Sequence, residues 1–173
     1  NVLTRRFPCC SGLPEVALAR STFLPSSVVN AAAYFPGISP GSIATLFGAN
    51  LSDASVTINN IPATVFFTSN RQVNFLVPDN IPEGFAQVSI TTSIGSTDSV
   101  DVPMTAVSPG LFAAVNRGTY IEIYATGLRT TDQQKVTIGS SQKDALFSGP
   151  APGLPRLYQI NATIPPGTPS KAP

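Results

Sequence analysis

The sequence contains no histidine and no tryptophan, only two cysteines, and few charged residues. Without histidine, a serine or cysteine nucleophile lacks its usual general base, and a zinc site lacks its commonest nitrogen ligand. No glycine-rich loop precedes a helical pattern, so a phosphate-cradling motif is missing too. The acidic residues are scattered, and the spacing of Asp98 and Asp101 matches no calcium loop. We therefore expect no enzymatic activity, no cofactor and no bound metal.

Charge is scarce, at 11% of residues and a net value of +1. This balance provides no field that would attract nucleic acid or an anionic membrane. No apolar run approaches the roughly 20 residues of a membrane-spanning helix. The chain begins at Asn1 rather than Met, so we expect either a processed exported protein or a piece of a longer one.

Cys9 and Cys10 are adjacent. A disulfide between neighbours is strained, because bridges usually need Cα atoms about 4.4–6.8 Å apart. Two free thiols or an unusual vicinal pair are one interpretation, and a disulfide to a second molecule is the other.

Short β-branched segments bounded by Gly, Pro, Asn or Asp make up most of the sequence. They occupy residues 42–48, 55–59, 63–69, 72–78, 86–93 and 98–103. Helical periodicity is unconvincing, and its best candidates, residues 12–21 and 26–34, are short. The pattern predicts an all-β protein built from antiparallel sandwiches.

An internal repeat organises these segments. "GSIATLFGANL" (41–51) aligns without gaps with "GTYIEIYATGL" (118–128), and "VTIN" (56–59) aligns with "VTIG" (136–139). "QVNFLVP" (72–78) then aligns with "QINATIP" (159–165), so the offset grows from 77 to 87 residues. Such growth between blocks is typical of two copies of one strand framework with loops of different length. The repeat predicts an arm at 1–27, a first sandwich at 28–103, a linker at 104–117 and a second sandwich at 118–173.

Two apolar residues follow the Pro109-Gly110 turn of the predicted linker. These residues are Leu111 and Phe112. We expect them to form a wedge between the two sandwiches.

The last strand that both copies share contains unusual amides. Gln72 and Asn74, and their counterparts Gln159 and Asn161, fall on the face opposite the apolar residues because strand side chains alternate. Asn is depleted in strands. We expect these amides to tie the strand to a neighbouring loop or to backbone rather than to a ligand.

The ordered motifs resemble a known family. "VVNAAAYFPGISPGSIATLFGANL", "VTINNIPATVFFTSNRQVNFLVPDNIPEG", "VSPGLF" and "LYQINATIPPGTPS" are similar to an uncharacterised C-terminal domain of secreted acidobacterial proteins. That family is similar to the immunoglobulin-like IPT/TIG sandwiches. The resemblance covers residues 28 to 170 and implies an Ig-like fold in an extracellular or cell-surface protein. It supplies no catalytic residue and no ligand.

The second copy lacks strands that the first copy has. In copy one the shared proline is followed by two further strands, whereas in copy two only eight residues follow it. A sandwich without these strands has a sheet edge with unpaired backbone groups and an open core. Three explanations stay open: the strands lie in residues not given, the N-terminal arm folds back in cis, or another subunit donates a strand.

The predicted donor is residues 13–25 of the arm. As an extended strand it would place Val16, Leu18 and Leu24 on one face and Phe23 on the other. Donation between copies predicts a homo-oligomer or a filament.

Carbohydrate binding is the competing function. The rings of Tyr34, Phe35, Tyr120, Tyr124 and Tyr158 could stack on pyranoses, although aromatic residues at strand spacing are more often core or cross-strand pairs. The sequence thus favours a non-enzymatic extracellular or cell-surface structural protein that self-assembles by strand donation. The alternative is a spacer or adhesion module of a larger secreted protein that binds carbohydrate.

Overall fold

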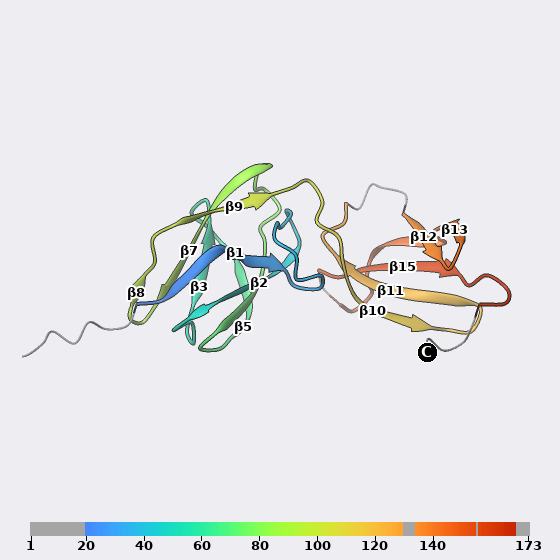
Figure 1. The fold of residues 1–173 in the computed structure, drawn as a ribbon, viewed down its shortest axis with the longest axis horizontal. Coiled ribbons are helices and arrows are strands. Elements are labelled where there is room, and N and C mark those ends of the chain that lie inside the picture. Colours follow the sequence, from blue (N-terminus) through green and yellow to red (C-terminus); the bar gives the residue numbers. More distant parts are fainter. Residues whose placement is uncertain (1–19, 130–133, 155, 169–173) are drawn as a thin grey trace, which may run out of the picture.

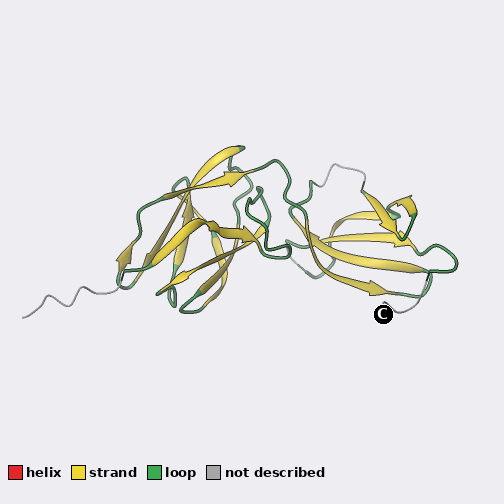
Figure 2. Ribbon diagram, in the orientation of Figure 1, coloured by secondary structure: helices red, strands yellow, loops and turns green. Residues whose placement is uncertain are grey.

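The computed structural model describes residues 20–129, 134–154 and 156–168. Within these ranges the regular secondary structure is β-strand throughout, as Figure 2 shows. All strand pairs are antiparallel apart from one isolated bridge between Ile38 and Met104. The predicted fold class, an all-β protein of tandem Ig-like sandwiches, is confirmed.

The first sandwich contains strands β1 to β9, in blue to yellow-green in Figure 1. One sheet has the order β1 (Thr22–Asn30), β2 (Ile43–Ala49), β6 (Gln72–Leu76) and β5 (Thr64–Thr68). The other has the order β4 (Ile61–Pro62), β3 (Ser55–Ile58), β7 (Gly84–Thr92) and β8 (Gly95–Ser96), with β9 (Val100–Met104) also paired to β7. Alternate residues of both sheets, among them Leu46, Phe75, Val88 and Ile90, are buried in one core.

The second sandwich contains strands β10 to β15 (Figure 1). Its larger sheet has the order β10 (Gly110–Asn116), β11 (Tyr120–Thr126), β15 (Tyr158–Thr163) and β14 (Phe147–Pro150). The other described strands are the hairpin of β12 (Lys135–Ile138) and β13 (Ser141–Asp144). Among the described residues the second sandwich therefore has no counterparts of β7 and β9 of the first. The buried apolar residues here are few and mostly small: Ile123, Ala125, Ala151, Ile160 and Ala162.

The repeat extends to the pairing of individual residues. Thr45 of β2 lies opposite Asn74 of β6, and its counterpart Glu122 of β11 lies opposite Asn161 of β15. In the hairpins, the β3–β4 register is repeated by β12–β13 at a constant offset of 80 residues. The two sandwiches therefore share one strand framework, and position-by-position comparison between them is justified.

The segment predicted as a linker differs in the structure, because β10 occupies most of it. Ala114 of β10 lies opposite Ile123, in the same place that Val28 of β1 takes opposite Leu46. Residues 105–109 alone connect the two strand sets. The signal that could have shown this is the match between "VVN" (28–30) and "AVN" (114–116), which is shorter than the other repeat blocks.

The predicted arm also ends earlier than expected, because β1 begins at Thr22. Phe23 lies opposite Gly48 of β2 and packs against the first core, while Leu24 is 67% exposed. Two of the four predicted donor residues thus belong to a strand that is paired within its own chain. The other arm residues singled out in the sequence lie outside the described residues: Cys9, Cys10, Val16 and Leu18.

Polar contacts, rather than the predicted apolar wedge, join the two sandwiches. Leu111 and Phe112 of β10 are 60% and 42% exposed, so they do not fill a core between the sandwiches. Instead, the amide of Ile43 donates to the Oγ1 of Thr126, a side chain without exposed surface, at 2.8 Å. The ion pairs Arg129–Glu83 (3.0 Å) and Arg156–Asp79 (3.3 Å) lie at the exposed margin of the junction.

Asn30 supplies another buried polar contact at this junction. Its side chain is 1% exposed; Nδ2 donates to the Ser108 carbonyl at 2.6 Å, and Oδ1 accepts from the Ala32 amide at 2.8 Å. The counterpart in the second sandwich, Asn116, is exposed, and its Oδ1 accepts from the Gly118 amide at 2.7 Å. Asn30 therefore closes a turn and also holds the connection between the sandwiches, whereas Asn116 closes a turn without a bond to that connection.

This pair provides a matched stability test. We expect Asn30→Ala to lower the free energy of unfolding by about 1–3 kcal/mol, because poorly hydrated partners lose their hydrogen bonds. Asn116→Ala, at an exposed position, should change it by about 0.5 kcal/mol or less. Chemical denaturation of both variants checks the prediction, and equal losses would contradict the role assigned to Asn30.

Candidate functional site

The outward side of the second sandwich's larger sheet gathers aromatic and polar side chains. Along β11, Ile123 and Ala125 point inward and are buried, so Tyr120, Glu122 and Tyr124 point outward by the period of two. The β11–β15 register then places Asn161 opposite Glu122 and Gln159 opposite Tyr124. We call the set Arg117, Tyr120, Glu122, Tyr124, Gln159 and Asn161 the Glu122 face.

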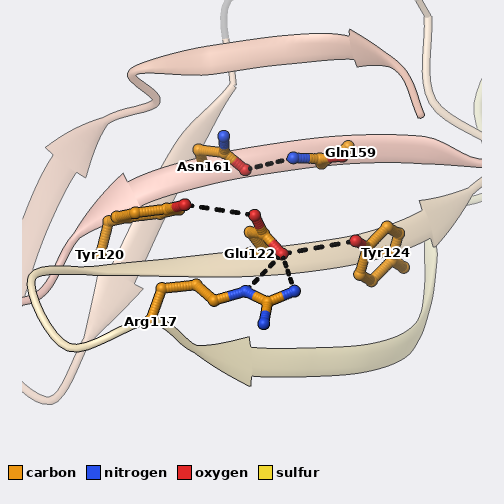
Figure 3. A network of polar contacts seen from close by, with 6 residues as sticks. All are labelled: Arg117, Tyr120, Glu122, Tyr124, Gln159 and Asn161. Carbon is orange, nitrogen blue, oxygen red and sulfur yellow. Dashed lines mark hydrogen bonds and ion pairs between the residues drawn. The ribbon is translucent and has the colours of Figure 1, made fainter. Parts of the chain in front are cut away.

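Glu122 lies at the centre of this face (Figure 3). Arg117, from the turn between β10 and β11, approaches its carboxylate with Nε and one terminal nitrogen, each at 2.8 Å. The hydroxyls of Tyr120 and Tyr124 donate to the two carboxylate oxygens from opposite sides, at 3.3 and 3.4 Å. These bonds orient both rings along the sheet surface.

The electrostatics of Glu122 follow from these contacts. The hydrogen bond from Arg117 is the main cause that lowers the pKa of Glu122; the charge of Arg117 and the two tyrosine hydroxyls act in the same direction, and desolvation opposes them. Reciprocally, the bond to Glu122 raises the pKa of Arg117. At neutral pH the pair is therefore fully ionised, and its charges compensate each other.

The acid–base groups of the Glu122 face differ from those of a glycoside hydrolase. Glycoside hydrolysis ordinarily uses two carboxyl groups, one of them a general acid with a raised pKa. The Glu122 face contains one carboxylate, and its pKa is shifted downward. Among the described residues, moreover, no three His, Cys, Asp or Glu side chains gather where they could hold a metal ion.

The repeated amides bond to each other, which differs from the expected contacts to a loop or to backbone. Gln159 Nε2 donates to Asn161 Oδ1 at 2.9 Å, and Gln72 Nε2 donates to Asn74 Oδ1 at 2.8 Å in the first sandwich. Neighbouring outward side chains on a strand lie within reach of each other, which makes this bond possible. Within the described residues, the Asn161 Nδ2 and Gln159 Oε1 atoms have no hydrogen-bond partner, so they can serve a ligand.

Comparison of the copies shows that the Glu122 face is particular to the second sandwich. The first sandwich keeps the amide pair but has Ile43, Thr45 and Phe47 in place of Tyr120, Glu122 and Tyr124. Sequence reasoning missed Glu122 and Arg117. The available signal was the substitution of a threonine by a glutamate between two tyrosines in the gapless alignment of residues 41–51 with 118–128.

The other predicted aromatic residues lie elsewhere. Tyr34 is 60% exposed and stacks on Phe47 at a centroid distance of 6.2 Å, and Phe35 is 73% exposed. Tyr158 lies opposite the inward Ala125, and burial, with a smaller effect of the Asp79 charge, raises the pKa of its hydroxyl. Of the five predicted rings, the structure brings only Tyr120 and Tyr124 together around shared polar groups.

Phe112 has a different position from the one expected. It lines an open groove of about 370 Å³ together with Tyr34, Phe66 and Leu157. The ring therefore contributes to a surface between the sandwiches without filling a core.

Comparison with known families finds an IPT/TIG domain at residues 33–102, which lies in the first sandwich. Curated proteins provide no match. Within the described residues no helix has the length and hydropathy of a membrane span.

Comparison with solved structures finds several at low similarity. One is a crystal structure with a xylogluco-oligosaccharide (TM-score 0.35, 13% identity, 75% of this chain and 33% of that one). Another is SGBP-B of the Bacteroides ovatus mixed-linkage glucan utilization locus in complex with a mixed-linkage heptasaccharide. Its TM-score is 0.40 and its sequence identity 17%, over 75% of this chain and 33% of that one. A third is the full extracellular region of plexin A4, domains 1 to 10. Its TM-score is 0.36 and its sequence identity 12%, over 84% of this chain and 13% of that one. This chain thus spans a third or less of each, and their ligands remain properties of those proteins.

The ionisation of Glu122 provides a direct test of the site. We expect the pKa of Glu122 to lie below its ordinary value of 4.5 and to rise toward that value in Arg117→Gln, which removes the main cause of the shift. Because the folded-state pKa is depressed, Glu122 stabilises the fold above the unfolded pKa, and this contribution disappears as the pH falls through the folded pKa. NMR titration of the side-chain carboxyl measures the pKa.

Arg129→Gln is the matched control, since it breaks an exposed ion pair with Glu83 away from this face. It should leave the titration of Glu122 unchanged. A Glu122 pKa at or above 4.5 in the unsubstituted protein would contradict the assigned geometry.

Proposed function

We propose that this protein is a non-enzymatic extracellular or cell-surface adhesion module, and that the Glu122 face binds a neutral carbohydrate. The observation that carries the proposal is the pair of half-buried tyrosine rings, Tyr120 and Tyr124, fixed on either side of one ion-paired carboxylate. The domain of IPT/TIG type and the resemblance to secreted domains support the extracellular setting.

The chemistry of the face fits a sugar. Aromatic rings provide flat apolar surfaces for the C–H faces of a pyranose, and a small number of placed polar groups fix its orientation. The Cα atoms of residues 120 and 124 are about 13 Å apart along the strand, from a rise of about 3.3 Å per residue, and both tyrosine hydroxyls point toward the carboxylate between them. Between them, the Asn161 amide and the Glu122 carboxylate present a donor and an acceptor to hydroxyl groups.

The charge balance favours a neutral ligand. Arg117 compensates the charge of Glu122, so neither an anionic nor a cationic sugar meets an unpaired opposite charge on this face. Both partners are already ordered by their mutual hydrogen bonds, so binding costs little side-chain entropy.

Self-assembly into fibres by donation of residues 13–25 remains a second, separate prediction. Its donor would have to be the part of the segment before β1, because Phe23 pairs within its own chain. Sedimentation analysis checks it: concentration-dependent growth of the full chain supports donation, and a monomer at all concentrations contradicts it.

Binding to neutral glycans tests the main proposal. The full chain should bind one or more neutral oligosaccharides on a glycan array, and Tyr124→Ala should weaken that binding about fivefold if the ring contributes about 1 kcal/mol. Tyr120→Ala should act in the same direction. Isothermal titration with the best glycan measures the affinities.

Phe47→Ala is the matched control, because Phe47 occupies the position of Tyr124 in the first sandwich. It should leave the affinity unchanged. The proposal is overturned if the folded chain binds no neutral glycan, or if Tyr120→Ala and Tyr124→Ala bind as well as the unsubstituted protein.

A further inference from the structure

The groove lined by Phe112 lies across the junction of the two sandwiches. Its aromatic residues are Tyr34 and Phe66 from the first sandwich and Phe112 from the second, and its volume is about 370 Å³. This volume is within the range of ligand sites, which occur preferentially where domains meet. None of the three rings belongs to the Glu122 face.

Two β-bulges direct Phe66 and Phe112 into this groove. On the edge strand β5, the pairing with β6 skips Phe66, which lies between the paired residues Val65 and Phe67. On the edge strand β10, the pairing with β11 skips Phe112 in the same way. A bulge changes the direction of a side chain and is over-represented beside functional sites. Each sandwich thus interrupts an edge strand at the residue that faces the groove.

A strained turn holds the third ring. Tyr34 has a φ of 57°, in the left-handed region that few non-glycine residues adopt. The Asn30 side chain closes this turn, because its Oδ1 accepts from the amides of Ala32 and Ala33. The Asn30 carbonyl accepts from the Tyr34 amide at 2.9 Å, and the Tyr34 ring stacks on Phe47. Backbone strain that the surrounding structure maintains is typical of ligand clamps.

The first sandwich also contributes a hydrogen-bond donor to the groove. Thr45 of β2 and Asn74 of β6 lie opposite each other, and both line the groove. Asn74 Oδ1 accepts from Thr45 Oγ1 at 3.0 Å and from Gln72 Nε2 at 2.8 Å. These bonds fix the orientation of the amide, and among the described residues Asn74 Nδ2 has no hydrogen-bond partner. Because Thr45 is 1% exposed, the Asn74 donor is the group of this pair that a ligand can reach.

These features restrict the chemistry of the occupant. None of the described residues that line the groove is charged, so charge complementarity favours a neutral ligand. The Asn74 donor requires an acceptor, whereas ligand N–H groups would lose their hydrogen bonds to water without replacement. A prolyl residue combines an apolar ring with a carbonyl acceptor and has no N–H.

The exposure of the rings favours a chain over a small molecule. Phe112, Phe66 and Tyr34 are 42%, 53% and 60% exposed, so the groove is shallow. Small-molecule sites usually bury most of the ligand surface. An extended chain instead gains contact by running along the groove from one sandwich to the other.

We propose that this groove binds a proline-rich segment of a partner protein in the polyproline II conformation. Aromatic-lined grooves recognise such segments, whose conformation is formed before binding and therefore costs little entropy. The proline rings pack on Tyr34, Phe66 and Phe112, and Asn74 Nδ2 donates to a carbonyl of the segment. The site is independent of ligand binding at the Glu122 face.

Capped decaproline tests the proposal, with a capped Gly/Ser peptide of equal length as the control ligand. Titration of decaproline into the full chain, followed by NMR, should shift the ring signals of Tyr34, Phe66 and Phe112 and the side-chain amide signal of Asn74. The Gly/Ser peptide should leave these signals in place. Absence of shifts at millimolar decaproline, or equal shifts with both peptides, overturns the proposal.

Substitution of one ring from each sandwich tests whether the segment contacts both. Phe66→Ala and Phe112→Ala should each weaken decaproline binding about fivefold. Phe85→Ala is the matched control, because Phe85 is an exposed ring of β7 outside the groove, and it should leave the affinity unchanged. Unchanged affinity in Phe66→Ala or in Phe112→Ala overturns the proposal.

Asn74→Asp tests the hydrogen bond. An aspartate keeps the acceptor for Thr45 and Gln72 but has no Nδ2 donor, so decaproline should bind about fivefold more weakly. Equal or tighter binding would overturn the role assigned to Asn74. A glycan bound at the Glu122 face should not displace decaproline, and displacement would overturn the independence of the two sites.

Discussion

The pairing of Glu122 with Asn161 across β11 and β15 is the contact on which the arrangement of the second sandwich depends. A shift of one residue in this register would turn every side chain of β11 to the other face. Tyr120, Glu122 and Tyr124 would then point into the small core, and Ile123 would point to solvent. Burial of an ion-paired carboxylate among alanines is so unfavourable that the register is strongly specified. The register between β11 and β15 therefore determines both the outward Glu122 face and the inward core of the second sandwich.

Comparison of the two sandwiches distinguishes the features of the strand framework that both copies share from the positions at which they differ. Both keep the amide pair on the sixth strand or its equivalent, the hairpin register and the asparagine at the end of the first strand. They differ at three outward positions on one strand, where Ile43, Thr45 and Phe47 are replaced by two tyrosines and a glutamate. Outward positions contribute little to the core, so they are free to acquire a binding chemistry. That freedom explains why only one copy has the Glu122 face.

Much of the fold could be predicted from the sequence, since the repeat blocks lie on strands whose residues alternate between core and solvent. β10 could not be predicted, because its similarity to β1 is limited to three residues and its own Leu111 and Phe112, directly after a Pro-Gly turn, resemble an apolar loop. The partners of the amides were missed for another reason: a bond between Gln159 and Asn161 needs side-chain geometry that sequence spacing does not contain. Glu122 alone carries no motif, and its role depends on Arg117 reaching it from a turn.

We propose that the Glu122 face of the second sandwich, and not an aromatic surface of the first, recognises a neutral glycan. An NMR map of backbone amides and tyrosine rings, recorded while a binding glycan is titrated into the full chain, tests it most directly. We expect shifts concentrated at Tyr120, Glu122, Tyr124 and Asn161, with the region of Tyr34 and Phe47 unaffected. Shifts concentrated at Tyr34 and Phe47, with the β11 and β15 signals unchanged, would contradict it.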